Sequence, residues 1–394
     1  MSDALKSLDR FSDKEAVLQV AERLRATAQG HGPLQFMEFC GGHTHVLFRF
    51  GLRELLPPEL SLVHGPGCPV CVLPRGKIDS VLDLLDRNPD VILCTYADLL
   101  RVPGTAGRSL LRCRADGATV RAVYSPHHAL DLAQQNPHRK VVFLAIGFET
   151  TTPATAITIL EAQRAGLTNF FVYSLHLLTP PAVAHVLESP EIREHGTVQL
   201  DGFIGPGHVC AVIGTEPFEY FATEFQKPVV ITGFAPVDMM LGLLALTQLA
   251  REGASGCRVE NLYPRVVTRQ GNTKAKAIVA DVFELRRLSA WRGLGMVPYS
   301  AFRLRPAYQS FDVEHHFDIR EFDTRDHPAC LCSAIVRGVK KPTDCKLYGT
   351  GCTPDTPIGS CMVSGEGTCA AYFASGIGLP RRKQNVTPMS TAKT

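Results

Sequence analysis

Short, continuous hydrophobic runs alternate with helical patterns along most of the chain. The runs predict buried strands at residues 34–39, 60–64, 91–95, 141–146, 170–174, 201–204 and 229–232. Apolar positions between them recur at helical spacing, and the predicted helices include residues 78–85, 154–165 and 237–251. Strands that are buried on both faces read as unbroken apolar runs, so the alternation predicts an α/β fold with parallel sheets covered by helices.

Helical patterns also stand at both ends of this region. Ser12 and Glu15 have the spacing of a capping box, and Val17, Val20 and Leu24 follow at helical positions, which predicts a first helix. A further helix is expected near residues 273–285. After it, the stretch around Trp291 is rich in glycine and predicts a loop.

An internal repeat divides the α/β region. Residues 62–67 end in His-Gly-Pro-Gly, residues 203–207 end in Gly-Pro-Gly, and each segment precedes a predicted helix and strand. We therefore expect two related parallel-sheet αβα domains, residues 1–138 and 139–256. Residues 257–394 are expected to form a loop-rich C-terminal domain, with a disordered tail from Arg381.

Composition limits the function classes. The chain has 394 residues, of which 45% are hydrophobic and 20% charged, and a formal net charge of only +3. The length and hydrophobic content are sufficient for several buried cores. The small net charge gives no sign of the basic surface that nucleic-acid binding requires. The charged N-terminal sequence lacks the apolar core of a signal peptide, and no apolar run reaches the roughly 18 residues of a membrane span. We expect a cytoplasmic protein without nucleic-acid or membrane partners.

Six of the 13 cysteines lie in the last quarter of the chain, among Gly, Pro and Thr. Thiolates this dense, with no His among them, favour an iron–sulfur cluster. A zinc site is the alternative, but thiolate-only zinc usually shows paired Cys-x-x-Cys knuckles, and this spacing is irregular. These cysteines are Cys330, Cys332, Cys345, Cys352, Cys361 and Cys369.

Two further thiol motifs follow predicted strands. Cys40 lies in Phe-Cys-Gly-Gly-His-Thr-His, and Cys68 and Cys71 form a Cys-x-x-Cys after Gly-Pro-Gly. Functional loops of parallel sheets lie beyond the carboxyl ends of the strands, so we expect both motifs at one edge. Cys68 and Cys71 are a candidate redox dithiol. His43 and His45 would share a face with each other if the segment were extended.

No nucleotide-binding motif is present, since the chain lacks a Walker-type Gly-x-x-x-x-Gly-Lys-Ser/Thr and a Gly-x-Gly-x-x-Gly after a strand. The remaining isolated cysteines have no second thiol nearby in sequence, and we assign them no role. These are Cys94, Cys113, Cys210 and Cys257.

Taken together, six motifs resemble the HypD family, the maturation factors of nickel-iron hydrogenases, over nearly the whole chain. The motifs are Cys40-Gly-Gly-His-Thr-His45, Gly65-Pro-Gly-Cys-Pro-Val-Cys71, Asp98-Leu-Leu-Arg-Val-Pro-Gly104, Gly147-Phe-Glu-Thr-Thr-Thr-Pro153, Gly205-Pro-Gly-His208 and Met362-Val-Ser-Gly-Glu-Gly367. Their combination is far more specific than any one of them.

The resemblance implies a scaffold on which an iron bearing two cyanides and one carbon monoxide is assembled. It implies the partners HypC, which shares the iron, and HypE, which delivers cyanide made with HypF; the hydrogenase large subunit receives the product. By the resemblance, Cys40 is the candidate iron ligand, and Cys68 and Cys71 are a redox pair that also touches the metal. Hydrogen-bond donors such as His43, Thr44 and backbone amides would stabilise the anionic iron group, and His43 and His45 would adjust the strength of the iron site.

The resemblance also implies a 4Fe-4S cluster on the C-terminal cysteines, in a domain similar to ferredoxin–thioredoxin reductase. Cys332, Cys345, Cys352 and Cys369 are the expected ligands, with Cys361 as a spare. Two other functions stay open. A cluster-linked protein disulfide reductase needs the dithiol and the cluster but not Cys40, and a zinc-stapled interaction protein needs only the C-terminal thiols.

Overall fold

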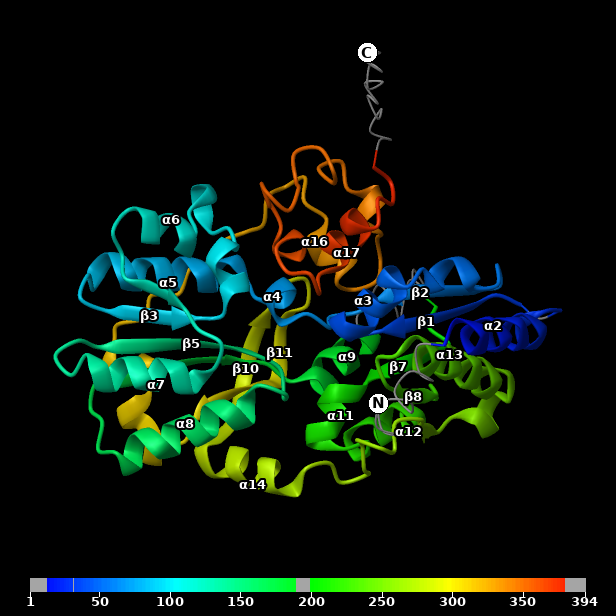
Figure 1. The fold of residues 1–394 in the computed structure, drawn as a ribbon, viewed down its shortest axis with the longest axis horizontal. Helices are drawn as coiled ribbons and strands as arrows, with labels where there is room; N and C mark the ends of the chain where they lie inside the picture. The colour runs from blue at the N-terminus through cyan, green and yellow to red at the C-terminus, as the bar shows by residue number, and fades with distance from the viewer. Residues whose placement is uncertain (1–12, 31, 189–198, 380–394) are drawn as a thin grey trace, which may run out of the picture.

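Two parallel sheets lie side by side in the computed structural model, which describes residues 13–30, 32–188 and 199–379 (Figure 1). The first sheet has the order β2-β1-β7-β8-β9 and the second β4-β3-β5-β6. The first contains β1 (Leu34–Glu38), β2 (Leu60–His64), β7 (Gly202–Pro206), β8 (Val229–Thr232) and β9 (Val259–Asn261). The second contains β3 (Ile92–Thr95), β4 (Val120–Ala122), β5 (Val141–Gly147) and β6 (Phe170–His176).

Every strand predicted from the apolar runs is present, and the α/β class with parallel sheets is confirmed. The short strands β4 and β9 were not predicted. Only Val120 of β4 is fully buried and β9 is half-buried throughout, so neither carries the continuous apolar run of a central strand.

Helices cover both sheets. On the first sheet, α2 (Lys14–Ala28) packs against α13 (Pro236–Arg251), and both contribute to one apolar cluster with β1 and β8. On the second sheet, the two faces are covered by different helices, as Figure 1 shows. One face carries α5 (Arg75–Arg87) and α6 (Leu110–Ala115), and the other carries α7 (Pro126–Gln135) and α8 (Thr152–Arg164).

The two sheets do not follow the expected ranges 1–138 and 139–256. In the first sheet β1 pairs with β7, in register from Phe36 with Gly202, although the strands come from opposite halves of the chain. In the second sheet β3 pairs with β5. The repeat is also unequal, because β7 and β8 are neighbours whereas β2 and β3 lie in different sheets.

Near residue 283 the structure differs from the predicted helix 273–285. The helix α14 (Thr273–Val282) ends earlier, and an antiparallel hairpin follows, formed by β10 (Phe283–Trp291) and β11 (Gly295–Leu304). The stretch after Trp291 is the turn of this hairpin. At the N-terminus, α2 is confirmed and is capped by Asp13, which accepts from the Glu15 amide. Ser12 and the tail from Arg381 lie outside the described residues.

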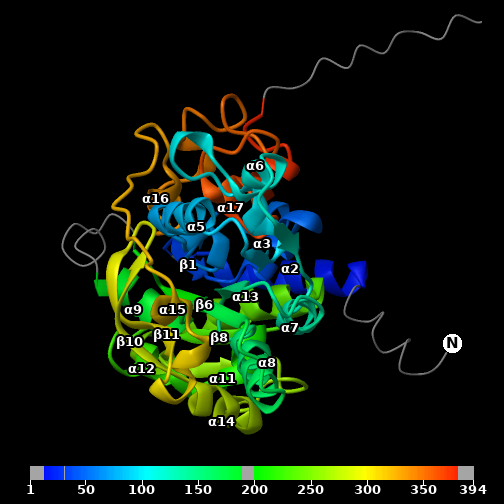
Figure 2. The same cartoon turned by 90° about the vertical axis from the view of Figure 1, so that its left-hand side faces the viewer.

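The C-terminal segment, residues 313–379, is loop-rich, as predicted, and its described α-helices are short: α15 (Val313–His316), α16 (Cys332–Ile335) and α17 (Thr368–Ala374). Figure 2 shows α16 and α17 at one end of the molecule, opposite α14, whereas α15 packs against β6. Its buried side chains belong to the same apolar cluster as those of α5 and β7, so its core is continuous with the α/β region. Among the described residues, no helix combines the length and hydrophobicity that a bilayer crossing requires.

Candidate functional site: a thiol cavity at the strand ends

Three loops meet at the carboxyl edge of the first sheet. Cys40 follows β1 and begins α3 (Gly41–Arg49), Cys68 follows β2 and begins α4 (Pro69–Val72), and His208 lies in α11 (Gly207–Ile213) directly after β7. Because β2, β1 and β7 are adjacent and parallel, their carboxyl ends lie together. The expected position of both thiol motifs at one edge is confirmed.

The loop glycines permit very close packing. A Cβ atom on Gly41 would lie 2.4 Å from the Cβ of Glu366, and one on Gly67 would lie 2.3 Å from the carbonyl carbon of Phe39. No side chain fits at either position without movement of the neighbouring chain. The Met-Val-Ser-Gly-Glu-Gly motif, which contains Glu366, therefore packs directly on the loop that holds Cys40.

Cys40 is buried, and its Sγ lies 3.1 Å from Nε2 of His208. Burial raises the pKa of the Cys40 thiol, and the nearby Glu38 carboxylate raises it further. Burial lowers the pKa of His208 to about 4, with a contribution from His43. At neutral pH the pair is therefore a thiol in hydrogen-bond contact with a neutral imidazole, and the tautomer of His208 decides which of the two donates. His208 closes the motif Gly205-Pro-Gly-His208, but its role beside Cys40 could not be derived from the sequence because the two residues lie 168 positions apart.

His43 and His45 do not share a face, because the segment is helical rather than extended. His45 is exposed. His43 is buried, its Nε2 lies 3.1 Å from the Gly233 carbonyl oxygen, and its ring stacks on Phe234 at 4.6 Å. The ring of His208 also stacks on Phe234, at 4.3 Å. His43 therefore anchors the Cys40 loop to the end of β8.

Glu38 is a buried carboxylate that the sequence analysis missed. It accepts from the Cys40 amide at 2.9 Å and also from the Thr44 hydroxyl and Nδ1 of His64. Burial alone would raise the pKa of Glu38, but the hydrogen bonds and charge of His64, with the two other donors, lower it. The Thr44 hydroxyl is thus committed to Glu38. The available signal was a polar residue closing each apolar strand, Glu38 at the end of β1 and His64 at the end of β2.

Cys68 and Cys71 are joined by a disulfide and are both buried. They line one small cavity, of about 10 Å³, together with Cys40 and residues from the C-terminal segment. The wall from that segment includes Cys361 and Glu366. The structure thus brings Cys40 and the dithiol, which the sequence placed in separate motifs, into a single thiol cavity.

The six C-terminal cysteines line a second small cavity, between Ile335, Tyr348 and Met362. It contains the four expected cluster ligands together with Cys330 and Cys361. A donor set made only of thiols in apolar surroundings fits an iron–sulfur cluster. Within the described ranges, however, no three His, Cys, Asp or Glu side chains converge in a preformed metal-ion site.

Cys361 connects the two cavities, because it lines both. Its sulfur accepts from the Cys369 amide at 3.3 Å, and its thiol lies beside that of Cys332, whose pKa this neighbour and burial both raise. Gly367 packs between the backbone of Cys361 and the sulfur of Cys71. A Cβ atom at this position would lie 2.2 Å from the Cys361 carbonyl oxygen and 3.1 Å from the Cys71 sulfur, so both cysteines lie close to the same glycine. The residue that we expected to be a spare therefore occupies the junction.

Comparison with known proteins identifies the class to which this cysteine-rich α/β fold belongs. The family model HypD, described as "Hydrogenase formation hypA family", matches residues 15–376. The chain is 55% identical over 372 residues to hydrogenase maturation factor HypD2 of Bradyrhizobium diazoefficiens, covering 94% of this chain and 97% of the relative.

Two other relatives agree. The chain is 54% identical to hydrogenase maturation factor HypD of Cupriavidus necator, covering 94% of this chain and 97% of the relative. It is 44% identical to hydrogenase maturation factor HypD of Escherichia coli K12, covering 94% of this chain and 98% of the relative. The chain therefore belongs to the HypD family of hydrogenase maturation factors, and the predicted resemblance is confirmed.

The environment of Cys40 predicts slow alkylation in iron-free, reduced protein. A raised pKa means less thiolate at pH 8, and each pKa unit removes about tenfold of the reactive form. We expect iodoacetamide to label Cys40 at least about tenfold more slowly than the partly exposed Cys257, with the Cys40 rate still rising above pH 9. Peptide mass spectrometry measures both rates in one sample. Equal rates at pH 8 would contradict the buried environment.

Gly41→Ala should destabilise the site, because its Cβ would clash with Glu366. Overpacking of this kind costs about 1–3 kcal/mol, and we expect a corresponding fall in the free energy of unfolding. Gly32→Ala is the matched control, since nothing lies within 4 Å of its Cβ position. Denaturant unfolding of both variants measures the difference in the free energy of unfolding. Equal values would show that Glu366 moves aside without destabilising the protein.

Proposed function

We propose that this chain is the cytoplasmic scaffold on which an iron carrying two cyanides and one carbon monoxide is assembled for nickel-iron hydrogenase. HypC would share the iron, HypE with HypF would supply cyanide, and the hydrogenase large subunit would receive the group. Membership of the HypD family supports this proposal, and the relatives are named as hydrogenase maturation factors.

The observation that carries the proposal is the thiol cavity itself. Cys40, Cys68 and Cys71 line one buried space, and Cys361 extends it to the C-terminal thiols. A disulfide reductase needs the dithiol and a source of electrons but no third thiol beside them. Cys40, held against an imidazole between glycine loops, gives this site a soft metal ligand as well.

Cys40 would bind the iron as a thiolate, with the iron as cargo. Its S–H proton would leave through Nε2 of His208, which lies 3.1 Å away. A histidine with a pKa of about 4 does not retain that proton at neutral pH, so it passes to solvent. Nε2 of His43, the Thr44 hydroxyl and the amides of Gly41, Gly65 and Gly67 already donate to oxygen atoms of the protein. The amides of Gly42 and His43, at the start of α3, lower the pKa of the Cys40 thiol and would stabilise its thiolate.

The dithiol would exchange with Cys361 by ordinary thiol–disulfide chemistry. The Cys361 thiolate attacks Cys71, the Cys68–Cys71 bond breaks, and Cys68 leaves as a thiolate that takes up a proton. Cys332, whose thiol lies beside that of Cys361, then attacks the Cys361 sulfur of the mixed disulfide, closes a Cys332–Cys361 disulfide and releases Cys71. Two electrons and two protons thus pass to the Cys68–Cys71 pair.

The C-terminal thiols would hold the 4Fe-4S cluster, which supplies single electrons when bound. If Cys332 forms a disulfide with Cys361, it cannot also bind the cluster. We therefore propose an alternative ligand set in which Cys330 replaces Cys332, namely Cys330, Cys345, Cys352 and Cys369. All of these side chains line the same cavity. Cys369 also contacts Cys361 and donates its amide to the Cys361 sulfur, so the choice between Cys330 and Cys332 rests on the variants described below.

Cys40→Ala tests the scaffold. In anaerobic protein co-purified with HypC, this change should remove the infrared bands of iron-bound cyanide and carbon monoxide, because it deletes the proposed iron thiolate. The visible absorption of the cluster should remain. Cys94→Ala is the control, a buried cysteine inside the second sheet, and should keep all bands. If the Cys40→Ala protein kept the cyanide and carbon monoxide bands at full intensity, the scaffold role of Cys40 would be wrong and the disulfide-reductase function would be favoured.

Paired variants at Cys330 and Cys332 test the cluster ligands. If Cys330 is a ligand and Cys332 an exchange thiol, Cys330→Ala lowers iron and sulfide content, while Cys332→Ala leaves both intact and stops reduction of the Cys68–Cys71 disulfide. Iron and sulfide analysis with thiol counting separates the two. The opposite pattern would restore Cys332 to the ligand set, and zinc in place of iron would support the zinc-stapled alternative.

A further inference from the structure

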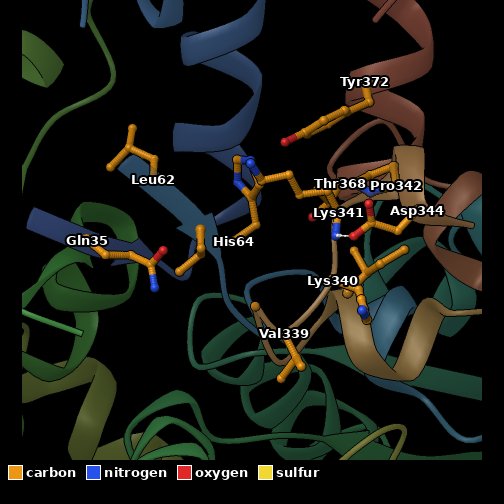
Figure 3. A pocket seen from close by; sticks show the side chains of 13 residues that line it. Gln35, Leu62, His64, Val339, Lys340, Lys341, Pro342, Asp344, Thr368 and Tyr372 are labelled. Atoms are coloured by element: carbon orange, nitrogen blue, oxygen red, sulfur yellow. Dashed lines mark hydrogen bonds between the residues drawn. The ribbon is translucent and has the colours of Figure 1, made fainter. Parts of the chain in front are cut away.

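The short helix α16 contacts the α/β region differently on its two sides. On one side Ile335 lines a pocket of about 290 Å³, which Figure 3 shows between His64 of β2 and the C-terminal loop. Two residues of a helix correspond to about 200° of rotation, so Ser333 faces the other way. There it packs on the turn of the β10–β11 hairpin, where a Cβ atom on Gly293 would lie 2.6 Å from the Ser333 carbonyl oxygen. Arg292 precedes this glycine and fills the contact.

Arg292 is buried and is bonded to the end of the dithiol helix. Its side chain is 4% exposed, and Nε donates to the Leu73 carbonyl oxygen at 3.0 Å. Its backbone amide donates to the Val72 carbonyl oxygen at 2.7 Å. Val72 is the last residue of α4, which carries Cys71. The arginine is therefore fixed to the helix of the Cys68–Cys71 pair.

A carboxylate ties the same guanidinium to the helix that carries Cys332. One oxygen of Asp326 accepts from Nη1 of Arg292, and the other accepts from the Ser333 hydroxyl at 3.1 Å. Ser333 follows Cys332 in α16, and Cys332 lines the cavity of the C-terminal thiols. Contact with Cys361 and burial raise the pKa of Cys332, whereas the charge of Arg292 lowers it. The guanidinium thus acts on the wall of that cavity.

The third nitrogen of the guanidinium is left over. Nη2 of Arg292 is buried and has no hydrogen-bond partner in the part of the chain that the structure describes. A guanidinium has five N–H donors and no acceptor, so a buried nitrogen without a partner leaves charged donors unsatisfied. Such a group destabilises the fold unless a ligand or ion accepts from it. A negatively charged sulfur in the neighbouring cavity is an acceptor of this kind.

We propose that Arg292 is a positioning residue for the iron–sulfur cluster: its Nη2–H donates to an anionic sulfur on the Cys332 side of the cavity and raises the reduction potential of the cluster. The inference rests on the proposed function, because it needs a cluster among the C-terminal thiols. A 4Fe-4S cluster with four thiolates is an anion and gains one more negative charge on reduction. A fixed, buried cation and a hydrogen bond to sulfur therefore stabilise the reduced form more than the oxidised form.

The direction of the effect is the same for both ligand sets, because Cys330 and Cys332 line one cavity. One side chain then serves both redox groups of the protein. Its Nε and backbone amide hold the end of the dithiol helix, while Nη2 faces the source of electrons. Arg292 lies outside every motif by which the sequence was interpreted, and its position follows only from the folded hairpin.

A redox titration of anaerobic full-length protein, followed by the visible absorption of the cluster, tests the proposal. Arg292→Gln should lower the equilibrium constant for one-electron reduction about tenfold, which is a fall of about 59 mV in potential. Arg292→Lys keeps the charge without the fork of donors and should recover part of the loss.

Arg101→Gln is the matched control. Arg101 is exposed and also ties the C-terminal segment to the α/β region, through the carbonyl oxygens of Pro354 and Val363. Water screens an exposed charge, so the potential should stay unchanged. A purely structural role of Arg292 would lower stability in both Gln variants and leave both potentials alone.

Asp326→Asn is a second variant with the opposite sign. It leaves the guanidinium less neutralised, so the potential should rise, and this result decides if Arg292→Gln holds no cluster. The proposal is overturned by an unchanged potential in Arg292→Gln, by equal falls in Arg292→Gln and Arg101→Gln, or by Arg292→Lys no higher than Arg292→Gln. Iron and sulfide analysis of the unmodified protein separates the two levels. Without a cluster there, the proposed function and this inference both fail, whereas a cluster insensitive to Arg292 overturns the inference alone.

Discussion

One buried carboxylate sets the geometry of the whole region at the strand ends. Glu38 closes β1, and its oxygens accept from the amide of Cys40, the hydroxyl of Thr44 and Nδ1 of His64. An unpaired carboxylate in that position would cost several kcal/mol, about the penalty of an isolated buried ion. The loop after β1, the start of α3 and the end of β2 therefore take positions that satisfy one side chain. The thiol cavity and the pocket beside His64 share this support.

The C-terminal segment is held to the α/β region by polar contacts as well as by its continuous core. Ser360 donates to the Cys71 carbonyl oxygen at 3.1 Å, and Arg101 donates to the Val363 carbonyl oxygen at 3.0 Å. These contacts fix the chain on either side of Cys361 against the dithiol helix and the loop after β3. The junction between the two thiol cavities is thus a product of packing between segments more than 250 positions apart.

The sequence predicted the elements better than their assembly. Central strands such as β5 and β6 are buried along their whole length, so their apolar runs were unambiguous. The hairpin β10–β11 is partly exposed and was read as the end of a helix and a loop. Pairing of β1 with β7 could not be predicted, because the repeat suggested sheets made of consecutive strands. The thiols were evident from their motifs, whereas Glu38, His64 and His208 acquire their roles only from contacts made in the folded chain.

The discontinuous first sheet has a consequence for the order in which the site is made. The chain starts this sheet with β1 and β2, leaves to build the whole of the second sheet, and returns 166 positions later, where Asp201 bonds to Gln35. During synthesis the second sheet can fold as a unit while β1 still lacks its central neighbour. Cys40 then has no His208 beside it and no Cys361 across the cavity. A nascent chain consequently presents lone thiols, and the combined site exists only in a protein whose translation is almost finished.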